Sequence, residues 1–147
     1  MSESPDFGFE SLEINNKTTA RYIIYAVKGE PYVDVMPALE TTRDYYNAVL
    51  RRTKKNMRRR MSAITATQLG EQRDEDRELF AAHIIKGWNF KDRAGNAIPF
   101  SQKNVHAMLK ALPDWLFDEM RTWCGDANNF LKQTDMTEEE VVETGEH

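Results

Sequence analysis

The sequence predicts an α+β fold, in which a small N-terminal antiparallel β-meander of about three strands is followed by a bundle of four to five helices. Before residue 37, short segments are rich in β-branched and aromatic residues, which favour strands. Between residues 42 and 131, apolar residues recur at steps of three or four, which is typical of amphipathic helices. The 147 residues, of which 40% are hydrophobic, suffice for one domain, which we place at residues 1–133.

The three strands are expected within residues 7–36. Residues 7–14 alternate loosely between apolar and polar side chains, and residues 32–36 alternate again. Residues 20–27 are rich in β-branched and aromatic residues, as strands are. Turn-forming Asn, Gly and Pro residues separate the three segments, so tight antiparallel connections are expected.

A long helix is expected over residues 42–64, with Thr41 or Thr42 as its N-cap. One face of this helix carries an apolar stripe with a single Thr interruption: Tyr46, Leu50, Thr53, Met57, Met61 and Ile64. The other faces carry seven cations within ten residues and no acid: Arg51, Arg52, Lys54, Lys55, Arg58, Arg59 and Arg60. We therefore expect the stripe to face the core and the cations to face outward.

The remaining helices follow from cap and turn residues, and residues 42–131 are expected to be mainly helical. Acids at 74–76 suit the first turn of a second helix, which is expected to end at Gly87. An extended, aromatic excursion around a turn follows. Ser101 is a candidate N-cap for the third helix, and Pro113 suits the first position of a fourth, whose apolar face runs to Leu131.

The composition indicates the cellular compartment in which the protein is expected. No apolar run approaches the roughly 20 residues that span a bilayer, and residues 1–6 are polar, so we expect a cytosolic protein without a membrane or signal segment. The single Cys124 is consistent with a reducing compartment. Residues 134–147 contain six acids and no aromatic residue, and are expected to form a disordered acidic tail.

The chain shows no pattern of an active site, a metal site or a cofactor site. The three histidines, His83, His106 and His147, are far apart in the sequence, and Cys124 stands alone. A Cys–His pair would need one histidine beside Cys124, which spacing neither shows nor excludes. No glycine-rich phosphate loop or nucleophile elbow is present. We therefore expect a protein that is not an enzyme, with no catalytic residue, metal or cofactor.

The basic segment 51–60 allows three interpretations. It is a solvated helix face, a contact for an acidic protein surface or for the chain's own tail, or a nucleic-acid site. The last is disfavoured because the run holds no aromatic for stacking and the rest of the chain carries 13 cations against 24 acids. The candidate protein contacts on this helix are Arg51, Arg52, Lys55, Arg58 and Arg59.

Three aromatic residues flank the turn before the third helix. Trp88, Phe90 and Phe100 either cover the helical core or form an exposed patch for a protein partner, since aromatics concentrate at interface centres. We keep all three as candidate contact residues.

Residues 79–131 carry a pattern that resembles a known family. A helix ends in Gly-Trp, an F-x-D-x-x-G turn follows, I-P-F-S-x-x-N opens a helix that runs to Leu-Pro, and the last helix ends in A-x-N-F. These motifs are Gly87-Trp88, Phe90 to Gly95, Ile98 to Ser101 with Asn104, Leu112-Pro113, and Asp126 to Phe130. Together they resemble the tail assembly chaperones of tailed bacteriophages.

The resemblance implies a small phage protein in the host cell cytoplasm that binds the tape measure protein and assists the assembly of tail tube protein around it. It implies no catalysis. Two alternatives stay open: a virion structural protein of the neck or tail-completion type, and a nucleic-acid-binding regulator that uses the basic helix 51–60. The sequence also leaves open a homo-oligomer, and a frameshifted longer form.

Overall fold

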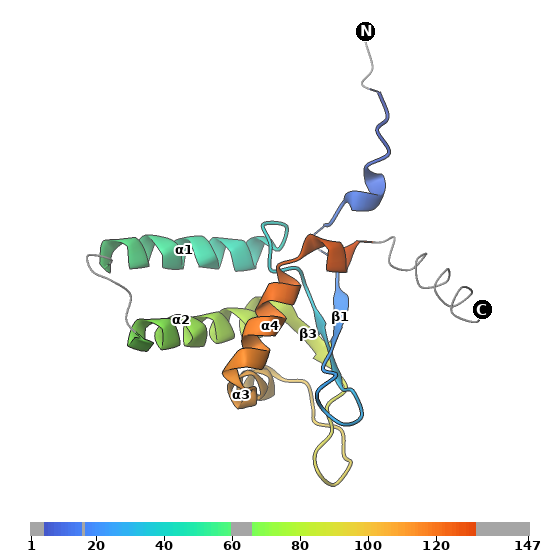
Figure 1. Ribbon diagram of the computed structural model, residues 1–147, viewed down its shortest axis with the longest axis vertical. Helices are drawn as coiled ribbons and strands as arrows, with labels where there is room; N and C mark the ends of the chain where they lie inside the picture. Colours follow the sequence, from blue (N-terminus) through green and yellow to red (C-terminus); the bar gives the residue numbers. More distant parts are fainter. Residues whose placement is uncertain (1–4, 16, 60–65, 132–147) are drawn as a thin grey trace, which may run out of the picture.

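The structure, a computed structural model, describes residues 5–15, 17–59 and 66–131. Figure 1 shows a small sheet beside four helices. The strands are β1 (Ala20–Ile23), β2 (Tyr32–Val35) and β3 (Ile85–Trp88). The helices are α1 (Arg43–Arg59), α2 (Ala66–Leu79), α3 (Gln102–Ala111) and α4 (Asp114–Cys124). Three short turns complete the order: η1 (Glu10–Leu12), the π-helical η2 (Phe80–Ile84) and η3 (Ala127–Phe130).

The predicted α+β fold class is confirmed, with a three-stranded antiparallel sheet of order β1-β2-β3. β1 pairs with β2 from Ala20 opposite Val35 to Ile23 opposite Tyr32. β2 pairs in turn with β3, with a register shift at Asp34/Val35. β1 and β3 are therefore the two edges of the sheet.

The prediction of a strand over residues 7–14 is wrong, and the third strand is β3. η1 interrupts the segment, and its first two apolar residues, Phe7 and Phe9, stand at odd positions whereas Leu12 and Ile14 stand at even positions. A strand shows one side of itself to a sheet, and these four residues cannot share one side. Ile85 of β3, by contrast, is buried and lies opposite Val35.

The core lies where the sheet meets η2, α3 and α4. Its fully buried side chains include Val33 and Val35 from β2, Leu109 from α3 and Met120 from α4. At its centre Phe80 packs edge-to-face against Phe117, with ring centroids 5.5 Å apart, which is a favoured arrangement of aromatic rings. The helix that begins at Ala66 thus delivers its last turn, η2, into the core and then changes to a strand, so it does not continue to the predicted end at Gly87.

α1 and α2 lie side by side and extend away from the sheet as a helical arm (Figure 1). The predicted burial of the apolar stripe on α1 is wrong at Leu50, which is 47% exposed, and at Thr53, which is also exposed. Tyr45 and Ala48 face the core instead. The side chains of Met57, Met61 and Ile64 lie outside the described part of the chain.

The C-terminal half confirms the predicted caps in most details. The Ser101 Oγ accepts a hydrogen bond from the Asn104 amide at 3.2 Å, which caps α3 as predicted. α4 begins at Asp114, one residue later than predicted, with Pro113 as its N-cap. The predicted last helix is shorter than expected because α4 ends before Gly125 and η3 follows as a separate turn. The predicted acidic tail, 134–147, lies outside the described residues. None of the described helices is long and apolar enough to cross a membrane.

Candidate functional site

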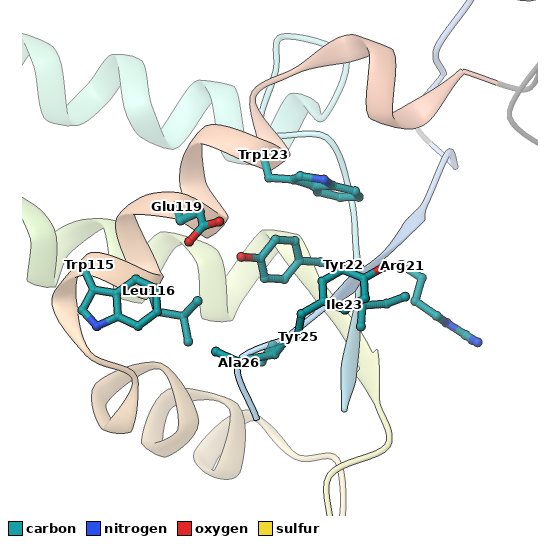
Figure 2. A pocket seen from close by; sticks show the side chains of 10 residues that line it. Arg21, Tyr22, Ile23, Tyr25, Ala26, Trp115, Leu116, Glu119 and Trp123 are labelled. Carbon is teal, nitrogen blue, oxygen red and sulfur yellow. The ribbon is translucent and has the colours of Figure 1, made fainter. Parts of the chain in front are cut away.

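A groove of about 370 Å³ lies between β1 with its following turn and α4. Figure 2 shows its two walls, with Trp115, Leu116, Glu119 and Trp123 from α4 and Tyr22, Tyr25 and Ala26 from the β1 side. Its volume falls in the usual range of ligand-binding pockets. It is lined by Arg21, Tyr22, Ile23, Ile24, Tyr25, Ala26, Trp115, Leu116, Glu119 and Trp123.

The spacing of α4 explains its wall of the groove. Leu116, Met120 and Cys124 recur at steps of four and are buried in the core. Trp115, Glu119 and Trp123 each precede one of them, so they form an adjoining stripe on the same side of the helix. The stripe thus carries one carboxylate between two indole rings.

The wall formed by β1 combines buried and exposed aromatics. Tyr22 is 6% exposed and packs edge-to-face on Trp123, with ring centroids 5.2 Å apart. Tyr25 and Trp115 are 71% and 58% exposed. Large aromatics are usually more buried than this, and aromatics that flank a groove favour the binding of another molecule.

Two polar groups in the groove have no partner in the described part of the chain. No described residue makes a hydrogen bond or an ion pair with the Glu119 carboxylate, and none hydrogen-bonds the Tyr22 hydroxyl. Burial, and secondly the charge of Glu119, raises the pKa of Tyr22 to about 12. The Tyr22 hydroxyl is therefore neutral at physiological pH, and Glu119 contributes a negative charge beside it.

Arg21 lies at the rim of the groove but is already paired. Its Nε lies 3.1 Å from the Asp34 carboxylate, and its guanidinium carbon lies 3.6 Å from the centroid of the Tyr32 ring. The hydrogen bond from Arg21 to Asp34 is the main reason that the pKa of Arg21 is raised. The Glu119 charge is thus not neutralised by Arg21, the cation among the described residues that line the groove.

The structure brings together the three predicted aromatic contacts. Trp88 packs edge-to-face against Phe90 and Phe100, with ring centroids 5.2 Å and 5.1 Å apart. The Trp88 indole donates a hydrogen bond to the Ile98 carbonyl oxygen at 2.9 Å. Trp88 and Phe90 are half-buried against the core, whereas Phe100 is 45% exposed. This cluster braces the hairpin between β3 and α3 and leaves mainly Phe100 for a contact.

The predicted basic contact residues of α1 fall into one that pairs within the chain and others that are exposed. Arg52 faces α2, where it pairs with Asp76 and lies 3.7 Å from Glu75. Arg51 and Lys55 are exposed, and so is Lys54 between them. Arg58 and Arg59 belong to α1, but their side chains lie outside the described part of the chain.

Arg52 is the first member of an ion-pair network that joins α1, α2 and α4. Asp76 also pairs with Arg121, and Arg121 pairs with Asp118. Arg73 reaches the same Asp118 at 3.0 Å. The hydrogen bond from Arg73, followed by that from Arg121, holds the pKa of Asp118 below its usual value. The predicted position of the acids 74–76 in a first helical turn is wrong, because α2 begins at Ala66 and they lie in its middle.

Cys124 is fully buried, and burial raises its pKa to about 12, so its thiol is protonated at neutral pH. Among the described residues, no group of three His, Cys, Asp or Glu side chains could hold a metal ion.

Sequence reasoning missed Tyr25, Trp115 and Glu119 as contact residues. The four-residue spacing of Trp115, Glu119 and Trp123 marks a helix face, but it does not reveal that this face lies opposite Tyr25.

Comparison with known protein families shows a match. The model of the family described as YdaY prophage protein matches residues 41–143. The matched range holds all four α-helices, β3 and the α4 wall of the groove, whereas β1 and β2 precede it. No curated protein and no solved structure matches the chain.

Proposed function

Because the chain belongs to the YdaY prophage protein family, we propose that it is a non-enzymatic chaperone of phage tail assembly in the host cell cytoplasm. Its client is the tape measure protein, which it keeps soluble while tail tube protein assembles around it. The prophage family supports a role in phage biology. The resemblance of residues 79–131 to tail assembly chaperones supports the narrower role.

The groove between β1 and α4 is the observation that carries this proposal. A chaperone of this kind works through protein contacts, and exposed aromatics around a concave site are typical of such contacts. Tyr25 and Trp115 supply two exposed rings on opposite walls. Phe100 is a second candidate contact, since it is the exposed member of the aromatic cluster.

Co-expression with the tape measure protein of the same prophage tests the proposal. We expect the two proteins to co-purify, and the tape measure protein to precipitate when this chain is left out. Trp115→Ala should weaken co-purification, whereas Leu50→Ala, which removes a similarly exposed apolar side chain from α1, should not. The proposal is wrong if the tape measure protein stays soluble alone and tails form after deletion of the gene.

The two alternatives have separate tests. Arg51, Lys54 and Lys55 are exposed on α1, and a nucleic-acid regulator would use them. Such a protein would shift nucleic acid in a gel with a steep salt dependence, and the Lys54→Ala/Lys55→Ala variant would not. A virion structural protein would be found by mass spectrometry in purified particles, from which a chaperone is absent.

A further inference from the structure

We propose that the groove between β1 and α4 recognises an extended segment of a partner protein that carries a Lys or Arg side chain between apolar residues. The cation would lie between Glu119 and the aromatic rings, and the segment would run along the open edge of β1. This inference rests on the proposed function only in taking the groove as a protein-binding site.

The polar groups of the groove select a cation. The Glu119 carboxylate and the Tyr22 hydroxyl line the same space, and neither has a partner among the described residues. The Tyr22 side chain is 6% exposed and its unpartnered hydroxyl is open to the groove, where it can accept a hydrogen bond from a bound cation. An ammonium or guanidinium group can donate to both oxygens at once.

The walls of the groove add to this selection. Trp115 and Trp123 flank Glu119 along α4, and Tyr25 stands on the other side (Figure 2). The face of an aromatic ring attracts a cation, most strongly for Trp. The same rings give apolar contact to the side chains that neighbour the cation in the partner segment.

The position of β1 favours an extended segment over a helix. β1 is an edge of the sheet, and its three consecutive residues 21–23 all line the groove, followed by residues 24–26 of the next turn. If only one face of β1 formed the wall, alternate residues would line it. The Ile24 amide donates to the Pro31 carbonyl oxygen on the β2 side at 2.8 Å, so the amides of Arg21 and Ile23 point to the open edge. There they can pair with an added strand.

The chain's own N-terminal segment is a poor occupant for reasons of charge. Residues 5–15 run away from the sheet (Figure 1) and expose Phe7 and Phe9, at 68% and 63%. This segment carries three acids, Asp6, Glu10 and Glu13, and no cation. Its negative charge opposes that of Glu119, so a basic partner segment is favoured over this segment of the same chain or of a second copy.

Peptide titration of the full chain tests the inference. The probes are three blocked heptapeptides, Ser-Leu-Thr-Xaa-Thr-Leu-Ser, with Lys, Gln or Glu at the centre, and a fourth peptide with the sequence of residues 5–14. Binding is measured by calorimetry at low salt and by the fluorescence of Trp115, with Trp115→Phe to assign the signal. We expect the Lys peptide to bind roughly ten-fold more tightly than the Gln peptide, a difference of about 1.4 kcal/mol, because only Lys brings a charge to Glu119 and the aromatic rings.

Variants decide whether Glu119 is responsible. Glu119→Gln should abolish the preference for Lys over Gln, whereas Glu71→Gln, an exposed carboxylate on α2, should keep it. The inference is overturned by an equal affinity for Lys and Gln peptides, by a preference that survives Glu119→Gln, by tighter binding of the 5–14 peptide, or by no binding at all.

These outcomes are separable from those of the proposed function. If the tape measure protein co-purifies but the peptides show no preference for Lys, the chaperone role stands and the cation site is wrong. If the peptides bind as expected but the tape measure protein does not co-purify, the cation site stands and the client is another basic protein.

Discussion

The Nε of Arg77, on α2, donates a hydrogen bond to the main-chain carbonyl oxygen of Leu109, on α3, at 3.1 Å. The remaining guanidinium nitrogens reach Asp74 at 2.8 Å and Asp114 at 2.7 Å. Arg77 is only 6% exposed and its guanidinium carbon lies 5.0 Å from the centroid of the Phe117 ring. One planar side chain therefore joins α2, the last turn of α3 and the first turn of α4.

Replacing Arg77 should lower the free energy of unfolding. Arg77→Met leaves the Leu109 carbonyl without its donor, which costs about 2 kcal/mol. Arg77→Lys keeps the positive charge but loses the planar guanidinium group that donates to three partners. We therefore expect the free energy of unfolding to fall by about 1 kcal/mol. Urea denaturation of both variants checks this, with Arg43→Met as the control, because Arg43 is exposed at the start of α1. A loss in the control equal to that of Arg77→Met would contradict the assignment.

Asp118 should stabilise the fold at neutral pH and lose this effect in acid. Its pKa is lowered by Arg73 and Arg121, so its contribution is present above the unfolded pKa near 3.8 and disappears as the pH falls through the folded pKa. Asp118→Asn should lower the melting temperature by about 3 °C at pH 7, since the pairs are partly exposed. The difference from the wild type should shrink below about pH 4. A difference that persists unchanged at pH 3 would show that charge is not the cause.

Tyr22 and Cys124 should make the protein sensitive to alkali. Both have a pKa raised to about 12, from 10.0 and 9.0, mainly because of burial. The neutral forms are the folded ones, so stability is full below pH 9 and is lost as the pH rises toward 12. Tyr22→Phe should lessen the loss by about 1.4 kcal/mol, measured from urea melts at pH 8 and pH 11.

The same burial should protect the Cys124 thiol. A thiol reagent at pH 8 should modify it only in denaturant, because the thiol is fully buried and protonated in the folded chain. Rapid modification of the native protein would contradict this.

Two glycines should respond to alanine in opposite directions. Gly95 has φ +88° in the turn between Lys91 and Ala97, where a Cβ is strained, so Gly95→Ala should destabilise the protein by about 1 kcal/mol. Gly70 lies within α2 with open space around it, so Gly70→Ala should stabilise it by about 0.5–1 kcal/mol. Thermal melts of the two variants provide the comparison, and shifts of equal sign would contradict it.

Structural elements that are stabilised by contacts between residues close in the sequence could be predicted. The Ser101 cap, the start of α4 after Pro113 and the turn at Gly95 depend on contacts within a few residues, and the structure has all three. β1 lies within its predicted segment, because β-branched and aromatic residues favour strands wherever a partner exists.

Structural elements that depend on contacts with residues far away in the sequence could not be predicted. β3 (IKGW) continues from a helix and becomes a strand only because β2 supplies its hydrogen bonds. Leu50 belongs to an apolar stripe by spacing, but α2 offers charged residues to α1, so Arg52 faces inward and Leu50 stays exposed. Periodicity alone cannot reveal which face a neighbouring helix will cover.

The same division applies to the candidate site, whose groove joins residues about ninety positions apart. The sequence alone determined that α4 is amphipathic, from its spacing, and that residues 20–27 favour a strand, from their β-branched and aromatic side chains. Only the tertiary structure decided that Tyr25 and Trp115 stand across a groove with Glu119 between the rings of α4. The physical reason is that the α4 wall is set by burial of Leu116, Met120 and Cys124 in a core that also includes the distant strand β2.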